Sequence, residues 1–483
     1  MKDVIKKQQQ EIERKYRPVP FWSWNDRLDP ELLRWQIREM DKAGLGGFFM
    51  HARGGLQTEY LGDEWMDCVG ACLDEAQKTG MEAWLYDEEG WPSGFGGGEV
   101  TDLGDRYHGR WLVVSRFDSE EVLKDAGLEN LLHTYEYGGE ILAVSHTSNP
   151  YYVDVMSRDA VAAFIESTHE RYYRRFKEHF DGTVKGFFTD EPRLSGDVEG
   201  DVPWSYCIRE VFRERHGYDI VPRLHALFVK CEGYEKVRYD FYRTVNDLFV
   251  SAYMEQIQAW CHAHHCKLTG HMMMEESIFT QMTGTGGVMP FYEYMDVPGI
   301  DWLRRMIGSP VVPRQLSSVA HQTGKKQTLT ESFALTGWNV RMEELKWIID
   351  WQLVNGVNLL CQHLAGYTLR GLRKRDYPPS LFYQLPWWEK YCILNDYVSR
   401  IGKMLSEGEY RAEVLLIHPM RSGWVAYEGA QNEALIRLDH DFTSSTELLS
   451  GMQVEYDLGD ESILARHGKI EAGGLRVGHA LYG

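Results

Sequence analysis

Two glutamates at the ends of short apolar segments are the first residues in this sequence whose type and placement suit catalysis. Glu191 comes just after residues 184–189, and Glu331 directly follows residues 327–330. Cleavage of a glycosidic bond needs one carboxylic acid that protonates the leaving oxygen and a second carboxylate that attacks the sugar or activates water. The pair therefore predicts this chemistry. The alternative for either glutamate is an ion pair with an arginine.

Further polar and aromatic residues follow the other apolar segments and are candidates for binding a substrate. Aromatic rings pack well against the flat apolar faces of sugars, and 16 Trp and 27 Tyr exceed what packing requires. The alternative for any single tryptophan is a place in the core. The candidates are Trp22, Trp24, Asn25, His51, Arg53, Asp87, Glu88, Trp91, Asp190, His271, Trp338 and His363.

Two acidic pairs among these residues lead to more specific expectations. Successive side chains of a strand point to opposite faces, so Asp190 and Glu191 are expected to point in opposite directions. The acidic run at residues 87–89 precedes Trp91 and predicts either sugar-hydroxyl binding or a calcium site, because hard cations take carboxylate and carbonyl oxygens. The spacing of this run is not that of an EF-hand loop, and the sequence assigns no metal ligand.

The elements that must position these residues alternate between short apolar strands and amphipathic helices, which favours a parallel α/β sheet. Eight strands with polar residues at their ends predict a (β/α)8 TIM barrel, in which functional groups lie at the carboxyl ends of the strands. A doubly wound sheet is the alternative, but no GxGxxG motif supports it. The strands are expected at residues 19–24, 47–51, 82–87, 184–189, 267–271, 294–297, 327–330 and 357–361.

Helices expected between these strands complete the pattern. An Asp-Pro pair at residues 29–30 and a glycine at position 80 mark a helix start and a helix end. The helices are expected at residues 30–43, 63–79, 157–180, 204–216, 234–265, 313–323 and 387–404.

The alternation of strands and helices is interrupted at two places, and these interruptions define the expected domains. Residues 100–155 predict a small β insertion after the third strand, and residue 413 is followed by a fresh apolar strand. We expect an N-terminal helical extension at residues 1–16, a catalytic barrel at 17–410 and a partial α/β domain at 411–483 that is truncated.

Composition restricts the partners. The formal net charge of −20 without a long basic run argues against nucleic acid and against an anionic membrane. Eight cysteines without a CxxC pair indicate reduced thiols rather than a zinc ribbon. No apolar segment suits a signal peptide or a membrane span, which predicts a cytoplasmic location. A carbohydrate is the expected partner, and the oligomeric state stays open.

Together the motifs resemble the α-L-rhamnosidase-like family of glycoside hydrolases, family 106, over most of residues 17–410. The resemblance implies a TIM barrel with glutamates after strands four and seven, Glu191 as general acid, Glu331 as base or nucleophile, an inverting and calcium-dependent reaction, and a following amidotransferase-like domain. The motifs that carry it are residues 21–25, 46–55, 84–94, 188–192 and 330–332.

Two other functions are compatible with a barrel that has polar strand ends. One is a non-catalytic carbohydrate-binding barrel. The other is a metal-dependent lyase or isomerase that uses His271, Asp296 and Glu331. The sequence leaves the sugar and its linkage open.

Overall fold

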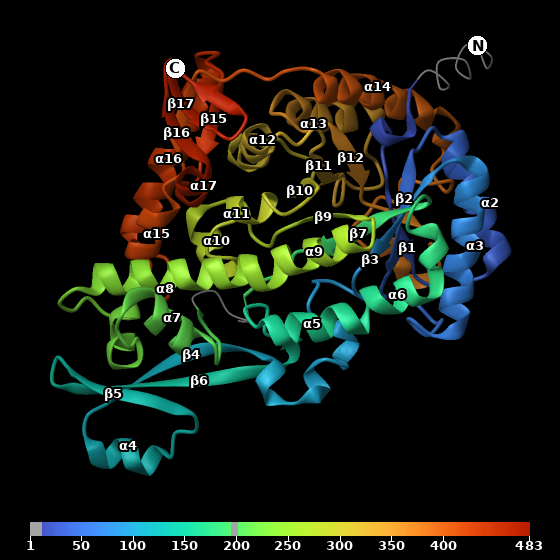
Figure 1. The fold of residues 1–483 in the computed structure, drawn as a ribbon. Helices are drawn as coiled ribbons and strands as arrows, with labels where there is room; N and C mark the ends of the chain where they lie inside the picture. The colour runs from blue at the N-terminus through green and yellow to red at the C-terminus, as the bar shows by residue number, and fades with distance from the viewer. Residues whose placement is uncertain (1–11, 195–200) are drawn as a thin grey trace.

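A nine-stranded parallel sheet forms the barrel in the computed structural model, which describes residues 12–194 and 201–483 (Figure 1). The short strand β13 pairs with β1, and the backbone N–H of Val19 donates to the carbonyl of Leu360 in β12, so the sheet closes between its first and last strands. In spatial order the strands are β12 (Leu359–Gln362), β11 (Leu329–Ser332), β10 (Val297–Trp302), β9 (Lys267–His271), β7 (Val184–Asp190), β3 (Glu82–Tyr86), β2 (Gly47–Ala52), β1 (Phe21–Trp24) and β13 (Ala365–Gly366).

Helices follow the strands and cover the outside of the barrel, which confirms the expected TIM-barrel class (Figure 1). The Asp29 carboxylate caps α2 by accepting from the backbone N–H of Leu32, and Gly80 ends α3 in the left-handed conformation. The covering helices are α2 (Pro30–Lys42), α3 (Asp63–Thr79), α5 (Arg158–Ser167), α6 (His169–Phe176), α7 (Ile208–His216), α8 (Tyr234–Phe249), α9 (Gln256–Ala263), α10 (Ile278–Gly284), α11 (Met289–Tyr292), α12 (Val311–Thr323), α13 (Met342–Val354) and α14 (Trp388–Glu407).

Several of the expected strand and helix boundaries are wrong, and the error with the largest consequence concerns the sixth strand. Residues 294–297 were expected to form it, but β10 starts at Val297 and contains Pro298 and Gly299, which weaken its strand pattern. Asp296 therefore lies at the amino end of the strand. Its carboxylate accepts from the backbone N–H of Leu268 and contacts Nε2 of His262 at 2.8 Å.

Two of the expected helices are interrupted in the structure. The helix expected at residues 157–180 divides at Thr168 into α5 and α6. The helix expected at 234–265 contains a π-helical stretch, Val250–Glu255, between α8 and α9. Residues 1–11 of the expected N-terminal extension lie outside the described residues, and Arg14–Tyr16 forms a short 3-10 helix.

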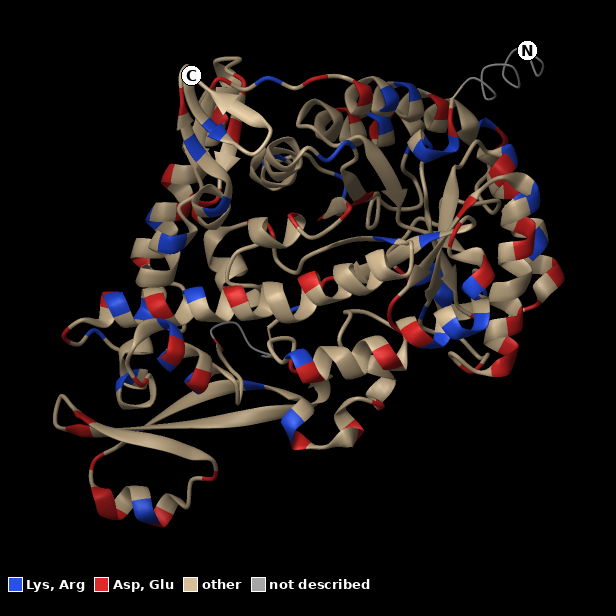
Figure 2. Ribbon diagram, in the orientation of Figure 1, with Lys and Arg blue, Asp and Glu red and all other residues tan. Residues whose placement is uncertain are grey.

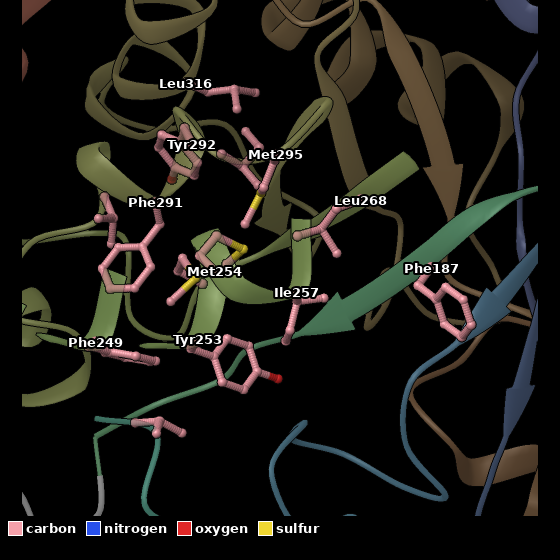
Figure 3. Close-up of a cluster of buried hydrophobic side chains, with 14 of the residues drawn as sticks. Phe187, Phe249, Tyr253, Met254, Ile257, Leu268, Phe291, Tyr292, Met295 and Leu316 are labelled. Carbon is pink, nitrogen blue, oxygen red and sulfur yellow. The ribbon is translucent and has the colours of Figure 1, made fainter. Parts of the chain in front are cut away.

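The barrel has an inner and an outer layer of buried side chains because strand residues alternate. Phe188 of β7 points inward, with its ring centroid 4.6 Å from that of Phe21. Its neighbour Phe187 points outward and packs on Trp260 of α9, with 5.7 Å between ring centroids. Figure 3 shows part of the outer layer, with Phe187 and Leu268 from the sheet and Tyr253, Met254 and Ile257 from the helical layer.

The expected β insertion is a four-stranded antiparallel sheet that lies beside the barrel (Figure 1). The sequence located the insertion but did not predict β5 or β8. β8 comes from the loop after β7 and pairs with β4, so the two loops are joined. The elements are β4 (His108–Phe117), α4 (Glu120–Ala126), β5 (Leu131–Tyr137), β6 (Glu140–Val153) and β8 (Val202–Trp204).

The C-terminal residues, called here the C-terminal unit, contain a parallel strand pair, β14 and β15, and a small antiparallel sheet. His321 of α12 contacts Asp457 of β15 at 2.6 Å, which connects the unit to the barrel. The division at residue 410 stays a prediction. The elements are β14 (Val414–Ile417), α15 (Met420–Ala426), α16 (Glu433–Gly451), β15 (Tyr456–Gly459), α17 (Glu461–His467), β16 (Gly468–Glu471), β17 (Gly474–Val477) and β18 (Ala480–Tyr482).

Charged residues of both signs are interspersed along the outer helices, as Figure 2 shows for α2 and α3. Within residues 12–194 and 201–483, no helix combines the length and the apolar character that crossing a bilayer requires.

Candidate active site

The carboxyl ends of the barrel strands, here called the mouth, bring Asp190 and Glu191 together. Asp190 continues the inward alternation of β7, and its Oδ2 accepts from the hydroxyl of Tyr86 at 2.6 Å. Strict alternation would point the Glu191 side chain away from the mouth. Its φ of 48° is not a strand conformation, so the alternation stops at this residue. Both carboxyl groups interact electrostatically with His271. The expectation that the two side chains diverge is therefore wrong, because the strand ends between them.

His271 and Glu331 form a buried pair at the centre of the mouth. Nε2 of His271 lies 2.6 Å from Oε2 of Glu331 and 3.7 Å from Oδ1 of Asp190. Burial opposes the imidazolium, but the hydrogen bond to Glu331 and the two carboxylates outweigh it and hold the pKa of His271 well above its ordinary value. Burial also raises the pKa of Glu331, and the hydrogen bond from His271 opposes that rise. The partner of Glu331 is thus a histidine, not an arginine.

Glu191 is half-buried and carries a carboxyl group suited to donating a proton near neutral pH. Burial raises its pKa to about 8; the positive charge of His271 and a hydrogen bond from Nε1 of Trp91 partly offset this, while Asp190 and Glu331 reinforce it. Trp91 lies on the glycine-rich loop after β3 and is 46% exposed, so it can contact a substrate as the sequence suggested.

Asp301 is a mouth residue that was not among the candidate site residues, although the sequence places it after the sixth strand. It pairs in register with Glu331 on the neighbouring strand, so the two side chains share the inner face. Its backbone N–H donates to Oε2 of the buried Glu275 at 3.0 Å. Among the described residues its buried Oδ1 has no hydrogen-bond partner. Burial first, and then Glu331, raise the pKa of Asp301 well above its ordinary value.

Arg53, His51 and His363 lie together on the other side of Glu331. The Arg53 guanidinium binds Asp376 through two bonds of 3.0 Å, and it lies 3.1 Å from Nε2 of His51 and 3.4 Å from Nε2 of His363. Burial and the nearby guanidinium hold the pKa values of both histidines well below the ordinary value, so both are neutral. Nε2 of His363 lies 4.0 Å from Oε1 of Glu331. This cluster was expected at the mouth, but its Asp376 partner was not.

Trp22, Trp24 and Asn25 do not fit the expected role in sugar binding. The two tryptophans are fully buried on the outer face of β1, where Nε1 of Trp22 donates to Gln36 of α2 at 2.7 Å. The side chain of Asn25 binds the backbone N–H and carbonyl of Thr368, each at 3.1 Å. The assignment fails because alternate residues of a barrel strand face the helices and not the mouth.

Asp87 and Glu88 also have structural partners. The Glu88 carboxylate accepts backbone N–H groups from the following glycine-rich loop, including that of Gly96 at 2.7 Å. Asp87 is fully buried and accepts from the hydroxyl of Ser93 at 2.5 Å. The acidic run therefore folds the loop that carries Trp91, and its carboxylates do not present themselves to a metal or a sugar.

The mouth could hold a metal ion only with a mixed set of donors. One ligand atom each from Asp190, His271 and Glu331 lie within 4.8 Å of one another. Calcium takes six to eight oxygen ligands, so a nitrogen already bonded to a carboxylate does not fit its shell. Asp296 lies at the opposite end of the barrel, so the trio of His271, Asp296 and Glu331 expected for a metal-dependent lyase or isomerase is not assembled.

A protein-family model described as alpha-L-rhamnosidase, glycoside hydrolase family 106, matches residues 140–466. The chain belongs to this family. The matched residues include β9 and β11, which carry His271 and Glu331, and β7, after which Glu191 follows. His51, Arg53 and Trp91 of the site precede the matched residues.

Solved structures share this fold at low sequence identity. The rhamnosidase from Novosphingobium sp. PP1Y has a TM-score of 0.72 and 14% identity, with 99% of this chain and 66% of that chain covered. A β-galactosidase from Bacillus circulans sp. alkalophilus has a TM-score of 0.58 and 11% identity, with 94% and 67% covered. At this identity the likeness extends to the fold alone.

One curated relative matches over a shorter segment. A protein of Formosa agariphila named "Putative beta-glucuronidase" is 25% identical over 283 residues, which are 55% of this family 106 chain and 22% of the relative. The chain thus spans about a fifth of the length of this curated relative.

Proposed function

We propose that the protein is a glycoside hydrolase that removes terminal α-L-rhamnosyl or related neutral sugar residues, with Glu191 as general acid and Glu331 as base or nucleophile. The observation that carries this proposal is the unlike environment of two glutamates at one barrel mouth. Glu191 is half-buried with its pKa raised to about 8, whereas Glu331 is bonded to a protonated histidine. When the surroundings of two carboxyl groups push their pKa values apart, the group with the higher pKa serves as the acid and the other as the base or nucleophile.

Glu191 supplies the proton in the first step. With a pKa of about 8 its carboxyl group is mostly protonated at pH 7, and it can donate to the glycosidic oxygen as the bond to the sugar breaks. Trp91 holds the carboxyl group through Nε1 and restricts its orientation.

Glu331 acts on the sugar carbon, either directly or through a water molecule. The His271 imidazolium binds Oε2 and favours the carboxylate form, while Oε1 stays at the mouth, 4.0 Å from His363. Positive charge develops on the sugar in the transition state, and the carboxylates of Glu331 and Asp190 stabilise it there. Whether the anomeric configuration is retained or inverted stays open, and NMR of the first-formed sugar would decide it.

The charges at the mouth favour a neutral sugar over a uronate. Burial favours the neutral form of Glu191 and of Asp301, which leaves the carboxylates of Asp190 and Glu331 beside the imidazolium of His271. The guanidinium of Arg53 is already bound twice by Asp376. Two carboxylates beside one imidazolium leave net negative charge for a sugar carboxylate to meet, which supports a rhamnoside over a glucuronide.

A panel of 4-nitrophenyl glycosides tests this proposal. We expect release of 4-nitrophenol from the α-L-rhamnoside with kcat/KM at least about 100-fold above that for the β-D-glucuronide, since uncompensated charge costs several kcal/mol. Binding of L-rhamnose in calorimetry without turnover of any glycoside would instead favour the non-catalytic barrel. A glucuronide preference would contradict the charge argument.

The Trp91→Phe variant tests the role of Glu191 through its pH dependence. A general acid works when protonated, so kcat/KM should fall as pH rises through about 8. The Trp91 hydrogen bond lowers the pKa of Glu191, and its loss should move this alkaline limb to higher pH. The pH profile of kcat/KM is the measurement, with Trp347→Phe on α13 as the control. A limb that stays in place or moves to lower pH would contradict the assignment.

Calcium stays a prediction from the family resemblance. The trio of Asp190, His271 and Glu331 does not fit a calcium shell, and no step of the proposed mechanism uses a metal.

A further inference from the structure

Large apolar side chains are exposed on three loops that follow neighbouring strands at the mouth. Met306 follows β10, Leu335 and Trp338 follow β11, and Tyr377 comes after β12 and β13. Their exposed fractions are 45%, 44%, 45% and 37%. A single exposed apolar residue needs no explanation, but a group on adjoining loops marks a binding surface.

The loops are bonded to one another, so the exposed side chains belong to one surface. Backbone hydrogen bonds join residues 335–337 to residues 377–378, and Nε1 of Trp338 donates to the carbonyl of Lys374 at 3.2 Å. The backbone N–H of Arg304 donates to the carbonyl of Ala334 at 2.7 Å and joins the loop of Met306 to the same group. We call Met306, Leu335, Trp338 and Tyr377 the rim platform.

Unfavourable backbone conformations are concentrated in these loops. Arg304, Phe333, Leu335 and Tyr377 have φ values of 74°, 85°, 59° and 42°. Such conformations in residues other than glycine persist only where the surroundings enforce them, and they are common at ligand sites. The rim platform is therefore held in a defined shape.

The platform adjoins the proposed catalytic residues through Tyr377. The Tyr377 ring centroid lies 5.7 Å from that of His363, and the Arg53 guanidinium lies 5.8 Å from the same ring. His363 in turn approaches Glu331. A ligand on the platform would thus lie beside the bond that Glu191 and Glu331 are proposed to cleave.

The chemistry of the platform favours an apolar ligand over a second sugar. The indole N–H of Trp338 is already bound to a carbonyl, and the nearby guanidinium of Arg53 is bound by Asp376. Leu335 and Met306 offer only aliphatic contact. A sugar needs partners for its hydroxyl groups, whereas a flat aromatic group needs only such apolar faces.

We propose that the rim platform is the subsite for a flat, apolar aglycone, the group that leaves when the terminal sugar is released. This inference rests on the proposed function. The inner carboxylates hold the sugar, because the barrel is closed below them by packed side chains, so the rest of the substrate must extend over the rim.

A pair of substrates tests the subsite by kinetics. For Trp338→Ala we expect kcat/KM to fall about tenfold with 2-naphthyl α-L-rhamnoside and less than twofold with methyl α-L-rhamnoside, since a tenfold change corresponds to about 1.4 kcal/mol, which is within the range of one ring contact. Trp347→Ala, an equally exposed tryptophan on α13, should change neither value. Equal losses for the two substrates, or no loss with the naphthyl substrate, would overturn the proposal.

Binding of 2-naphthol alone tests the subsite without turnover. Calorimetry should show that the unmodified protein binds 2-naphthol and that Trp338→Ala weakens the affinity about tenfold, while Trp347→Ala does not. Absence of binding, or equal binding by all three proteins, would overturn the subsite even if rhamnosides are cleaved. Loss of binding in Trp338→Ala would support it even if another glycoside proves to be the substrate.

Discussion

The Glu331→Gln variant is expected to cleave α-L-rhamnosides about 10³-fold more slowly than the unmodified protein, since a positioned base or nucleophile contributes 10²–10⁴. Glutamine has nearly the same shape, and its carbonyl oxygen can still accept from Nε2 of His271. It cannot take a proton from water or attack the sugar. The fall should therefore appear in kcat, as measured with 4-nitrophenyl α-L-rhamnoside.

Two controls separate this chemical effect from damage to the fold. Glu276→Gln, an exposed glutamate beyond β9, should keep full activity. The unfolding temperature of Glu331→Gln should be measured because replacing the charge leaves a buried imidazolium without its partner. A folded Glu331→Gln protein that keeps more than about a tenth of kcat would remove Glu331 from the mechanism.

The Glu191→Gln variant is expected to lose a factor of about 10²–10⁴ in kcat/KM with substrates whose leaving group needs a proton. The amide of glutamine cannot donate a proton to the leaving oxygen. The alkaline limb that Glu191 produces should disappear from the remaining activity, because the group with a pKa of about 8 is gone. The pH profile of kcat/KM checks both points.

Glu89→Gln is the matched control for this variant. Glu89 is an exposed glutamate on the same glycine-rich loop as Trp91, and it has no proposed part in catalysis. Its pH profile should keep the alkaline limb. If Glu191→Gln retains the limb, another group donates the proton, and Asp301, whose pKa burial also raises, is the first candidate.

Strand periodicity was sufficient to predict the barrel and the position of the two glutamates. Apolar runs such as residues 184–189 and 327–330 end where the barrel mouth begins, and any residue that follows them must lie there. The sixth strand was misplaced because Pro298 and Gly299 interrupt its apolar pattern.

The orientation of individual side chains was less predictable. The positive φ of Glu191, which brings two successive carboxyl groups to one site, has no signature in the sequence. Trp24 was assigned to the mouth although it lies on the outer face of β1, and a strict count of alternation from Phe21 would have shown this. Glu88 was assigned to substrate because its partners are backbone N–H groups, which a sequence does not display.

The central claim, that Glu191 donates the proton to the leaving group, is tested most directly by varying that group. The measurement is kcat/KM of Glu191→Gln relative to the unmodified protein for phenyl and 2,4-dinitrophenyl α-L-rhamnosides. We predict a loss of about 10²–10⁴ with the phenyl substrate and nearly full activity with the dinitrophenyl substrate, whose phenolate leaves without a proton. An equal loss with both substrates would contradict the account.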